Sequence, residues 1–196
     1  LRDSYVKNDL QDAGVKDSEA FYKLFRILAI QACGLVNTSE LAKTVRIKEE
    51  TVKHYMDIMQ KSFHLRLVKP FFRNLEKELV KMPMAYFMDS GMRNVLTGNF
   101  LPINGNPDIG GIWENQVFRI LADKYDIDEL RFWRTTDKKE VDFVLPMLQQ
   151  PLAFEVKASS DDEKPSKYKV FREAYPEFQF SFYTLEPFDE DLIRYM

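Results

Sequence analysis

Two consecutive apolar runs carry charged residues in their interiors, within EVDFVLPMLQQPLAFEVKAS at residues 140–159. The pattern predicts two strands joined by a hairpin turn that includes Gln149 and Gln150. A charge inside a buried strand is costly unless it is paired or binds a metal. Asp142, Glu155 and Lys157 therefore either lie at a solvated edge of a sheet or form a site.

The spacing of these three residues favours a site. Side chains alternate faces along a strand, so Glu155 and Lys157 share a face, and the hairpin register brings Asp142 opposite or close to Glu155. Two adjacent carboxylates repel and attract a hard divalent cation, Mg²⁺ or Mn²⁺. Such a cation activates water and polarises a phosphodiester, and Lys157 can orient the water or offset charge.

Helices and strands surround the hairpin in a recognisable order. A helix is expected over 112–125, a strand over 129–135, a helix over 164–175 with a proline in its first turn, and a strand over 178–186. Phe132 and Trp133 fit a core position better than a base-stacking one. The second half is therefore expected to be a mixed α/β domain.

The first half predicts three helices followed by two strands. Residues 1–18 suit a short helix that ends near Gly14; apolar periodicity then predicts helices from Glu19 to Gly34, over 37–47 with Thr38 or Ser39 as the cap, and over 48–63. Strands are expected at 64–72 and 85–89. This order favours a winged helix-turn-helix, with an ordinary three-helix bundle as the alternative.

A winged helix would present basic and polar side chains to DNA. The third helix and the wing offer a set of candidate contacts to bases and phosphates: Lys48, Thr51, Lys53, His54, Arg66, Lys69 and Arg73. The simpler interpretation pairs Lys53 with Asp57 on a solvated face and leaves His54 as a surface residue. Winged helices also serve as protein-docking modules. Of these two expectations, DNA binding is the favoured one.

Charge is distributed unevenly along the chain. The net charge is -3, yet residues 19–73 hold ten basic and five acidic side chains, whereas 112–196 hold twelve basic and eighteen acidic ones. The acidic second half is not expected to attract a phosphate backbone unaided.

No apolar run is long enough for a membrane span, and no signal-peptide core is seen, so a cytoplasmic location is expected.

Two further features settle the expected organisation. The Gly-, Pro- and Asn-rich stretch 99–111 predicts a boundary between domains at 1–98 and 99–196, and Asp89 is expected to cap the helix that precedes it. Cys33 lies in an apolar run and fits a buried thiol better than a reactive one. Two histidines and one cysteine leave no zinc cluster of the usual spacing.

The motifs of the second half resemble those of PD-(D/E)xK nucleases, which have the restriction-endonuclease-like fold. Asp142 is similar to the first acidic residue, Glu155-Val156-Lys157 to the (D/E)xK element, and Glu114 to the helical glutamate of Holliday-junction-resolvase-like members. Val141 stands where the motif has proline. The resemblance implies that Asp142, Glu155 and Glu114 bind the metal and that Lys157 acts on the attacking water.

Nearly the whole chain resembles the C-terminal half of prokaryotic AAA-type ATPases. The similar segments are YVKNDL, residues 35–92, WENQVFRIL, FWRTTDKKEVDFVL and FEVKAS. In these proteins a nucleotide-binding module precedes a winged helix and a nuclease-like domain of unknown function. No G-x-x-x-x-G-K-[ST] occurs here, so a C-terminal fragment without ATP hydrolysis is expected.

Two functions of different classes follow. The first is a DNA-binding region with a Mg²⁺-dependent nuclease site; the alternative is a non-catalytic DNA- or protein-interaction module that regulates the missing ATPase. The expected partners are DNA and the chain's own ATPase module, to which ATP would bind. No membrane is expected as a partner, and self-association stays open.

Overall fold

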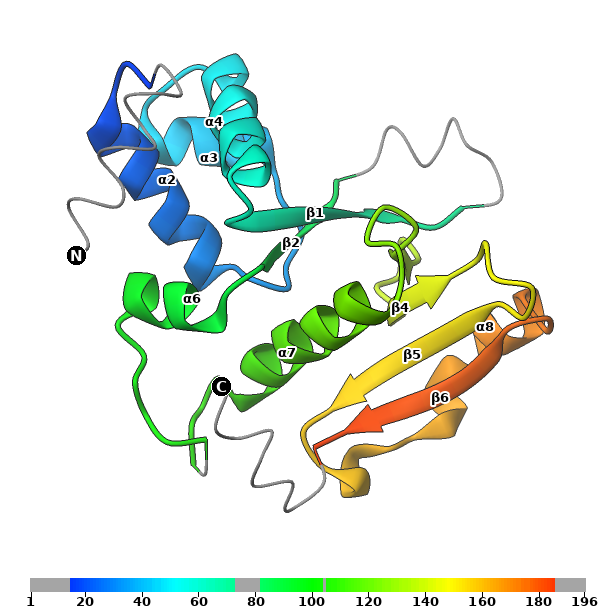
Figure 1. Ribbon diagram of the computed structural model, residues 1–196. Coiled ribbons are helices and arrows are strands. Elements are labelled where there is room, and N and C mark those ends of the chain that lie inside the picture. The colour runs from blue at the N-terminus through cyan, green and yellow to red at the C-terminus, as the bar shows by residue number, and fades with distance from the viewer. Residues whose placement is uncertain (1–14, 73–81, 104, 186–196) are drawn as a thin grey trace. The chain divides into compact units, whose positions relative to one another are not determined.

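The computed structural model of the chain describes residues 15–72, 82–103 and 105–185, and it is a mixed α+β structure (Figure 1). Six α-helices and six strands lie within these residues, and the strands form a mixed sheet in the order β2-β1-β3-β4-β5-β6. The predicted helix over the first residues and the candidate contact Arg73 lie outside them.

Two compact units divide the chain. The first comprises residues 1–67 and 85–100, and the second comprises 68–84 and 101–196. The sequence-based boundary at residue 98 stays a prediction. The compact units interleave along the chain, so they do not correspond to two consecutive segments.

Three helices open the first unit: α2 (Ser18–Ile30), α3 (Thr38–Val45) and α4 (Glu49–Lys61). They confirm the three helices that the apolar periodicity predicted. The expected cap of α3 was wrong, because the side chain of Asn37 accepts the N–H groups of Ser39 and Glu40. Thr38 instead donates its hydroxyl to Glu49 at 2.8 Å, which ties α3 to α4.

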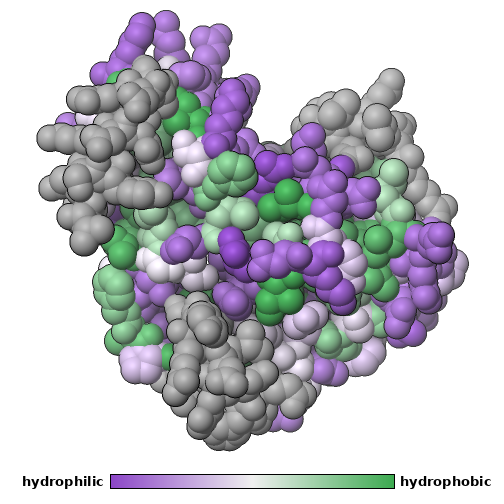
Figure 2. Space-filling model, viewed as in Figure 1, coloured by the Kyte–Doolittle hydropathy of each residue, from purple (hydrophilic) through white to green (hydrophobic). Residues whose placement is uncertain are grey.

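The outward face of α4 is charged, and hydrophilic residues cover this part of the molecule in Figure 2. Its inward face supplies Val52, Tyr55, Met56 and Met59 to the core of the first unit, in keeping with the apolar periodicity that predicted this helix.

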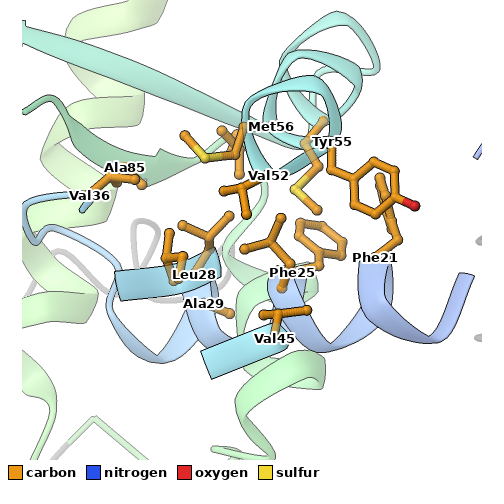
Figure 3. Packing of buried hydrophobic residues seen from close by; sticks show 14 of the residues in the cluster. Phe21, Phe25, Leu28, Ala29, Val36, Val45, Val52, Tyr55, Met56 and Ala85 are labelled. Atoms are coloured by element: carbon orange, nitrogen blue, oxygen red, sulfur yellow. The ribbon is translucent and has the colours of Figure 1, made fainter. Parts of the chain in front are cut away.

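The core of the first unit is built around aromatic rings from separate elements (Figure 3). Phe25 stacks on Phe87 with ring centroids 5.5 Å apart, and Phe21 meets Tyr55 edge to face at 5.3 Å. Phe25 is 1% exposed, so its whole side chain contributes to the hydrophobic stabilisation of this unit.

Two strands and a helix follow α4; the two strands were predicted after the third helix. Strand β1 spans Leu65–Pro70, β2 spans Met84–Phe87, and α6 spans Ser90–Thr97. Asp89 caps α6, as predicted, by accepting the N–H of Met92. The last residues of β1 differ from a free wing, because Lys69 and Pro70 belong to the second unit and pair there in parallel with β3.

The second unit has the predicted order of elements. It contains α7 (Ile109–Lys124), β3 (Arg131–Arg134), β4 (Glu140–Leu145), β5 (Leu152–Lys157), α8 (Lys169–Ala174) and β6 (Gln179–Thr184). The predicted helix over 164–175 is split: a 3₁₀ turn, Pro165–Tyr168, precedes α8. A proline at the first position of the turn is compatible with such a start.

Both faces of this sheet are covered within the second unit. Trp113 of α7 packs near Tyr183 and donates its indole N–H to the Tyr183 carbonyl at 3.2 Å. On the other face Trp133 packs against Phe171 of α8, and both Phe132 and Trp133 are buried, as the core interpretation predicted.

The expectation for Cys33 needs a correction, because its side chain is only partly buried. The residue lies in the turn after α2 with φ at 65°, and its N–H donates to the carbonyl of Ala85 at 2.8 Å. A turn position leaves the thiol less enclosed than a place inside the helix would.

Across the described ranges, no helix is long and apolar enough to cross a membrane.

Candidate active site

Asp142 and Glu155 lie beside each other where the paired part of the β4–β5 hairpin ends. The register runs from Leu145↔Leu152 to Phe143↔Phe154, so the next position joins Asp142 and Glu155. The Asp142 carboxylate accepts the backbone N–H of Val156 at 2.7 Å. The alternation of side chains along each strand and the register of the hairpin therefore bring together the two carboxylates, as the sequence predicted.

Glu155 is buried, with 6% of its surface exposed, and holds two donors on one oxygen. Its Oε1 accepts the ammonium of Lys157 at 2.5 Å and the hydroxyl of Tyr168 at 2.6 Å. Its Oε2 is buried and has no hydrogen-bond partner among the described residues. A buried carboxylate oxygen without a donor is costly, and it provides a free position for a ligand.

Lys157 is held in place by a second contact. Its Nζ also donates to the carbonyl of Val156 at 2.9 Å. Burial lowers the pKa of Lys157, but the hydrogen bond to Glu155 and the nearby carboxylates, Asp142 and Glu114 among them, outweigh that effect and raise it. Lys157 therefore remains a cation within this acidic cluster.

The electrostatics connect Glu114 to the same cluster. Burial raises the pKa of Asp142 well above its usual value, and the negative charges of Glu114 and Glu155 raise it further. The N–H of Val156 and the charge of Lys157 act in the opposite direction. Glu114 comes from α7, so a third element adds negative charge to the cluster; the resemblance alone had implied a part for this residue.

Tyr168 is a part of the cluster that sequence reasoning missed. It lies in the 3₁₀ turn Pro165–Tyr168, is 6% exposed, and packs its ring near Phe180 and Phe182 of β6. The sequence predicted a helix over this stretch and gave no signal that Tyr168 would face the cluster.

The residues present fit a divalent cation bound by two carboxylates. Within the described residues no group of three or more His, Cys, Asp or Glu side chains is gathered closely enough to form a ready-made metal site. Mg²⁺ does not need one, because it is commonly held by one or two carboxylates and keeps several waters. The unpartnered Oε2 of Glu155 offers an acceptor to a cation, and the neighbouring negative charges that raise the pKa of Asp142 attract one.

The candidate DNA contacts are spread over two units. Lys48, Lys53 and His54 are exposed on or beside α4, and Thr51 is partly buried there. Arg66 is partly buried on β1, and Lys69 on the same strand is exposed.

Ion pairs occupy part of the α4 surface. The predicted pairing of Lys53 with Asp57 was wrong: Lys53 pairs with Glu49 and Lys61 pairs with Asp57, each at 2.7 Å. Helix geometry allows Lys53 to pair with either Glu49 or Asp57, since each lies four residues from it. Both pairs are exposed, so the lysines can exchange these partners for phosphates at little cost.

Two family models match the chain along its length. The chain belongs to the family of a domain of unknown function (DUF8612), whose model matches residues 1–102. A second domain of unknown function (DUF4143) matches residues 109–190, which include the whole acidic cluster.

Two mycobacterial proteins are similar to this chain. Each is 28% identical to it over 187 residues: the uncharacterized protein Mb2031c of Mycobacterium bovis and the uncharacterized protein Rv2008c of Mycobacterium tuberculosis. The match covers 92% of this chain but 42% of each relative, so the chain spans less than half of their length. No solved structure matches the chain.

Proposed function

We propose that the second domain is a metal-dependent nuclease domain of the PD-(D/E)xK type that hydrolyses phosphodiesters in DNA. The observation that carries the proposal is that Asp142, Glu155 and Lys157 meet where the paired part of one hairpin ends, and that the Oε2 atom of Glu155 is buried without a hydrogen-bond partner among the described residues. Glu114 adds a further negative charge from α7. Such groupings of perturbed side chains are typical of functional sites.

Each residue has a distinct part in the proposed reaction. Asp142 and Glu155 hold Mg²⁺ or Mn²⁺, and Glu114 supports the cation or a water beside it. When bound, the cation would polarise the phosphodiester and promote ionisation of the attacking water. Lys157, fixed by Glu155 and the Val156 carbonyl, orients that water or offsets charge on the phosphate in the transition state.

The first domain is proposed to bind duplex DNA as a winged helix, with α4 in the major groove. Residues 19–73 are net basic, and α4 displays Lys48, Lys53 and His54 on its exposed face. The acidic second domain then depends on this basic region to hold duplex DNA.

The longer context is proposed to be an AAA-type ATPase. The second family is commonly found in proteins associated with such ATPases. The similar mycobacterial proteins also extend well beyond the region matched here. An ATPase module is therefore the proposed partner, and self-association is an open expectation from the sequence.

A non-catalytic interaction module is the second candidate. One observation favours it: the described residues contain no group of three metal-ligating side chains, while 112–196 carry a net negative charge. In that case the acidic cluster would bind a basic partner surface and regulate the ATPase.

The deciding experiment measures Mn²⁺ binding by calorimetry and cleavage of labelled linear, nicked and branched DNA. The variants are Asp142→Asn, which keeps an acceptor for the Val156 N–H, and Lys157→Ala. We expect Asp142→Asn to lose metal binding and Lys157→Ala to bind metal without cutting. If the wild-type chain binds no Mn²⁺ and cuts no DNA, the interaction module is the better explanation.

A further inference from the structure

A short basic segment lies within the acidic second domain. Residues 164–172, KPSKYKVFR, contain Lys164, Lys167, Lys169 and Arg172 and no acidic residue. The acidic run 161–163 precedes the segment and Glu173 follows it. The four cations are all exposed, so they are available to a ligand in solution.

The segment borders a surface hollow of about 570 Å³. The hollow has an aromatic part, Phe178 and Phe180, and a polar part that includes Ser166 of the 3₁₀ turn and Lys169, Arg172 and Glu173 of α8. Phe178 is buried and Phe180 is partly exposed. Aromatic surface beside exposed cations is the combination that binds unstacked bases and their phosphates.

The hollow is one aromatic ring away from the acidic cluster. Phe180 lies opposite Ala153 in the parallel pairing of β5 and β6, and two residues along β5 on the same face is Glu155. The ring of Tyr168 lies 5.0 Å from that of Phe180, at an interplanar angle of 31°, and its hydroxyl donates to Glu155. A strand bound in the hollow would therefore have its backbone near the carboxylates.

We infer that this hollow, with the basic segment 164–172, binds single-stranded nucleic acid and directs one strand to the acidic cluster. One unstacked base lies against Phe180, and Lys169 and Arg172 contact the phosphates beside it. A base inside a duplex has its faces covered by its neighbours, so a single strand or a frayed end is the matching ligand. The inference rests on the proposed nuclease function, whose substrate class it specifies.

The carboxylate of Glu173 also faces this ligand and limits the charge of the site. It approaches Lys169 at 3.6 Å, and both side chains are largely exposed. Such an exposed pair is weak, so phosphate can displace Glu173. The pairing leaves Arg172 as the stronger anchor, since its planar guanidinium can hold a phosphate with two hydrogen bonds.

The test measures binding of a fluorescently labelled oligothymidylate and of a duplex of equal length to the 196-residue chain in EDTA, over a range of salt concentrations. The variant Lys169→Gln/Arg172→Gln removes the two central cations, and Lys124→Gln/Lys138→Gln removes two exposed lysines elsewhere in the second unit as a matched control. A third variant, Phe180→Leu, removes the ring; near-ultraviolet circular dichroism checks its fold.

We expect the double variant, but not the control, to weaken single-strand binding and to reduce the salt slope by about 1.4, which corresponds to two phosphate contacts. Phe180→Leu should weaken single-strand binding by about tenfold. Equal loss in the double variant and the control, or no single-strand binding by the wild-type chain, would overturn the inference. Because EDTA prevents cleavage, strand binding without any later cutting with Mn²⁺ would refute the nuclease and leave the strand site standing.

Discussion

Replacing Tyr168 by phenylalanine tests how the acidic cluster is held together. The change removes one hydroxyl and keeps the ring that packs near Phe180 and Phe182. The lost hydroxyl donates to Glu155 at 2.6 Å in a buried setting. Glu155 would keep Lys157 as its only side-chain donor among the described residues.

The expected loss of stability follows from this geometry. A hydrogen bond to a charged group contributes about 1.5–3 kcal/mol, so we expect the free energy of unfolding of the second unit to fall by about 2 kcal/mol. With a urea dependence of about 2 kcal/mol per M, the midpoint of unfolding should fall by about 1 M.

Urea unfolding followed by tryptophan fluorescence reports on this unit selectively. Both tryptophans of the chain, Trp113 and Trp133, lie in the second unit. Tyr183→Phe is the matched control, since the Tyr183 ring packs near Trp113 and no hydrogen bond of its hydroxyl is seen within the described ranges. An unchanged midpoint in Tyr168→Phe, or an equal fall in the control, would refute the role assigned to the hydroxyl.

The effect of this change should depend on pH in a defined direction. Burial and the hydrogen bond to Glu155 raise the pKa of Tyr168 above its usual value of 10.0. A raised pKa in the folded state means that the stabilisation is fully present below about pH 10 and is lost as the pH rises further. The difference between wild type and Tyr168→Phe should therefore be constant from pH 6 to about pH 9 and shrink above about pH 10.

Three smaller predictions concern the first unit. Asp89→Ala removes the cap of α6 and should lower the free energy of unfolding by about 1 kcal/mol in urea titrations followed by circular dichroism, whereas Asp89→Asn should retain most of it. The hydrogen bonds from Lys53 and Thr38 hold the pKa of Glu49 below its usual 4.5; the stabilisation is thus present above pH 4.5 and fades as the pH falls, so Glu49→Gln should lower the melting temperature at pH 7 and have less effect at pH 3. Lys53→Gln should reduce the salt slope of duplex binding by about 0.9 in anisotropy titrations, and an equal change in Lys23→Gln, on α2, would count against contact through α4.

Some corrections show where local patterns are insufficient. The cap of α3 was expected at Thr38 or Ser39, but Asn37 supplies it. All three residue types can cap a helix, so the sequence does not show at which of them the helix begins. The predicted helix over 164–175 is a 3₁₀ turn followed by α8, since the contact of Tyr168 with the sheet competes with a continuous helix.

The order of the elements and the three central residues of the candidate site could be predicted from the sequence. Helices and strands were readable because their apolar periods are local, and a hairpin is short enough that its register follows from alternation. Asp142, Glu155 and Lys157 therefore met as predicted. The core positions of Phe132 and Trp133 were predicted as well.

The residues that surround Asp142, Glu155 and Lys157 depend on tertiary packing. The bond from Tyr168 to Glu155, the approach of Glu114 from α7, and the parallel pairing of Lys69 with Arg131 each join residues distant in the sequence. Sequence periodicity carries no information on such pairs, because they depend on which faces of separate elements pack together. For the same reason the hollow beside Phe180 became visible only once β6 and α8 were placed against each other.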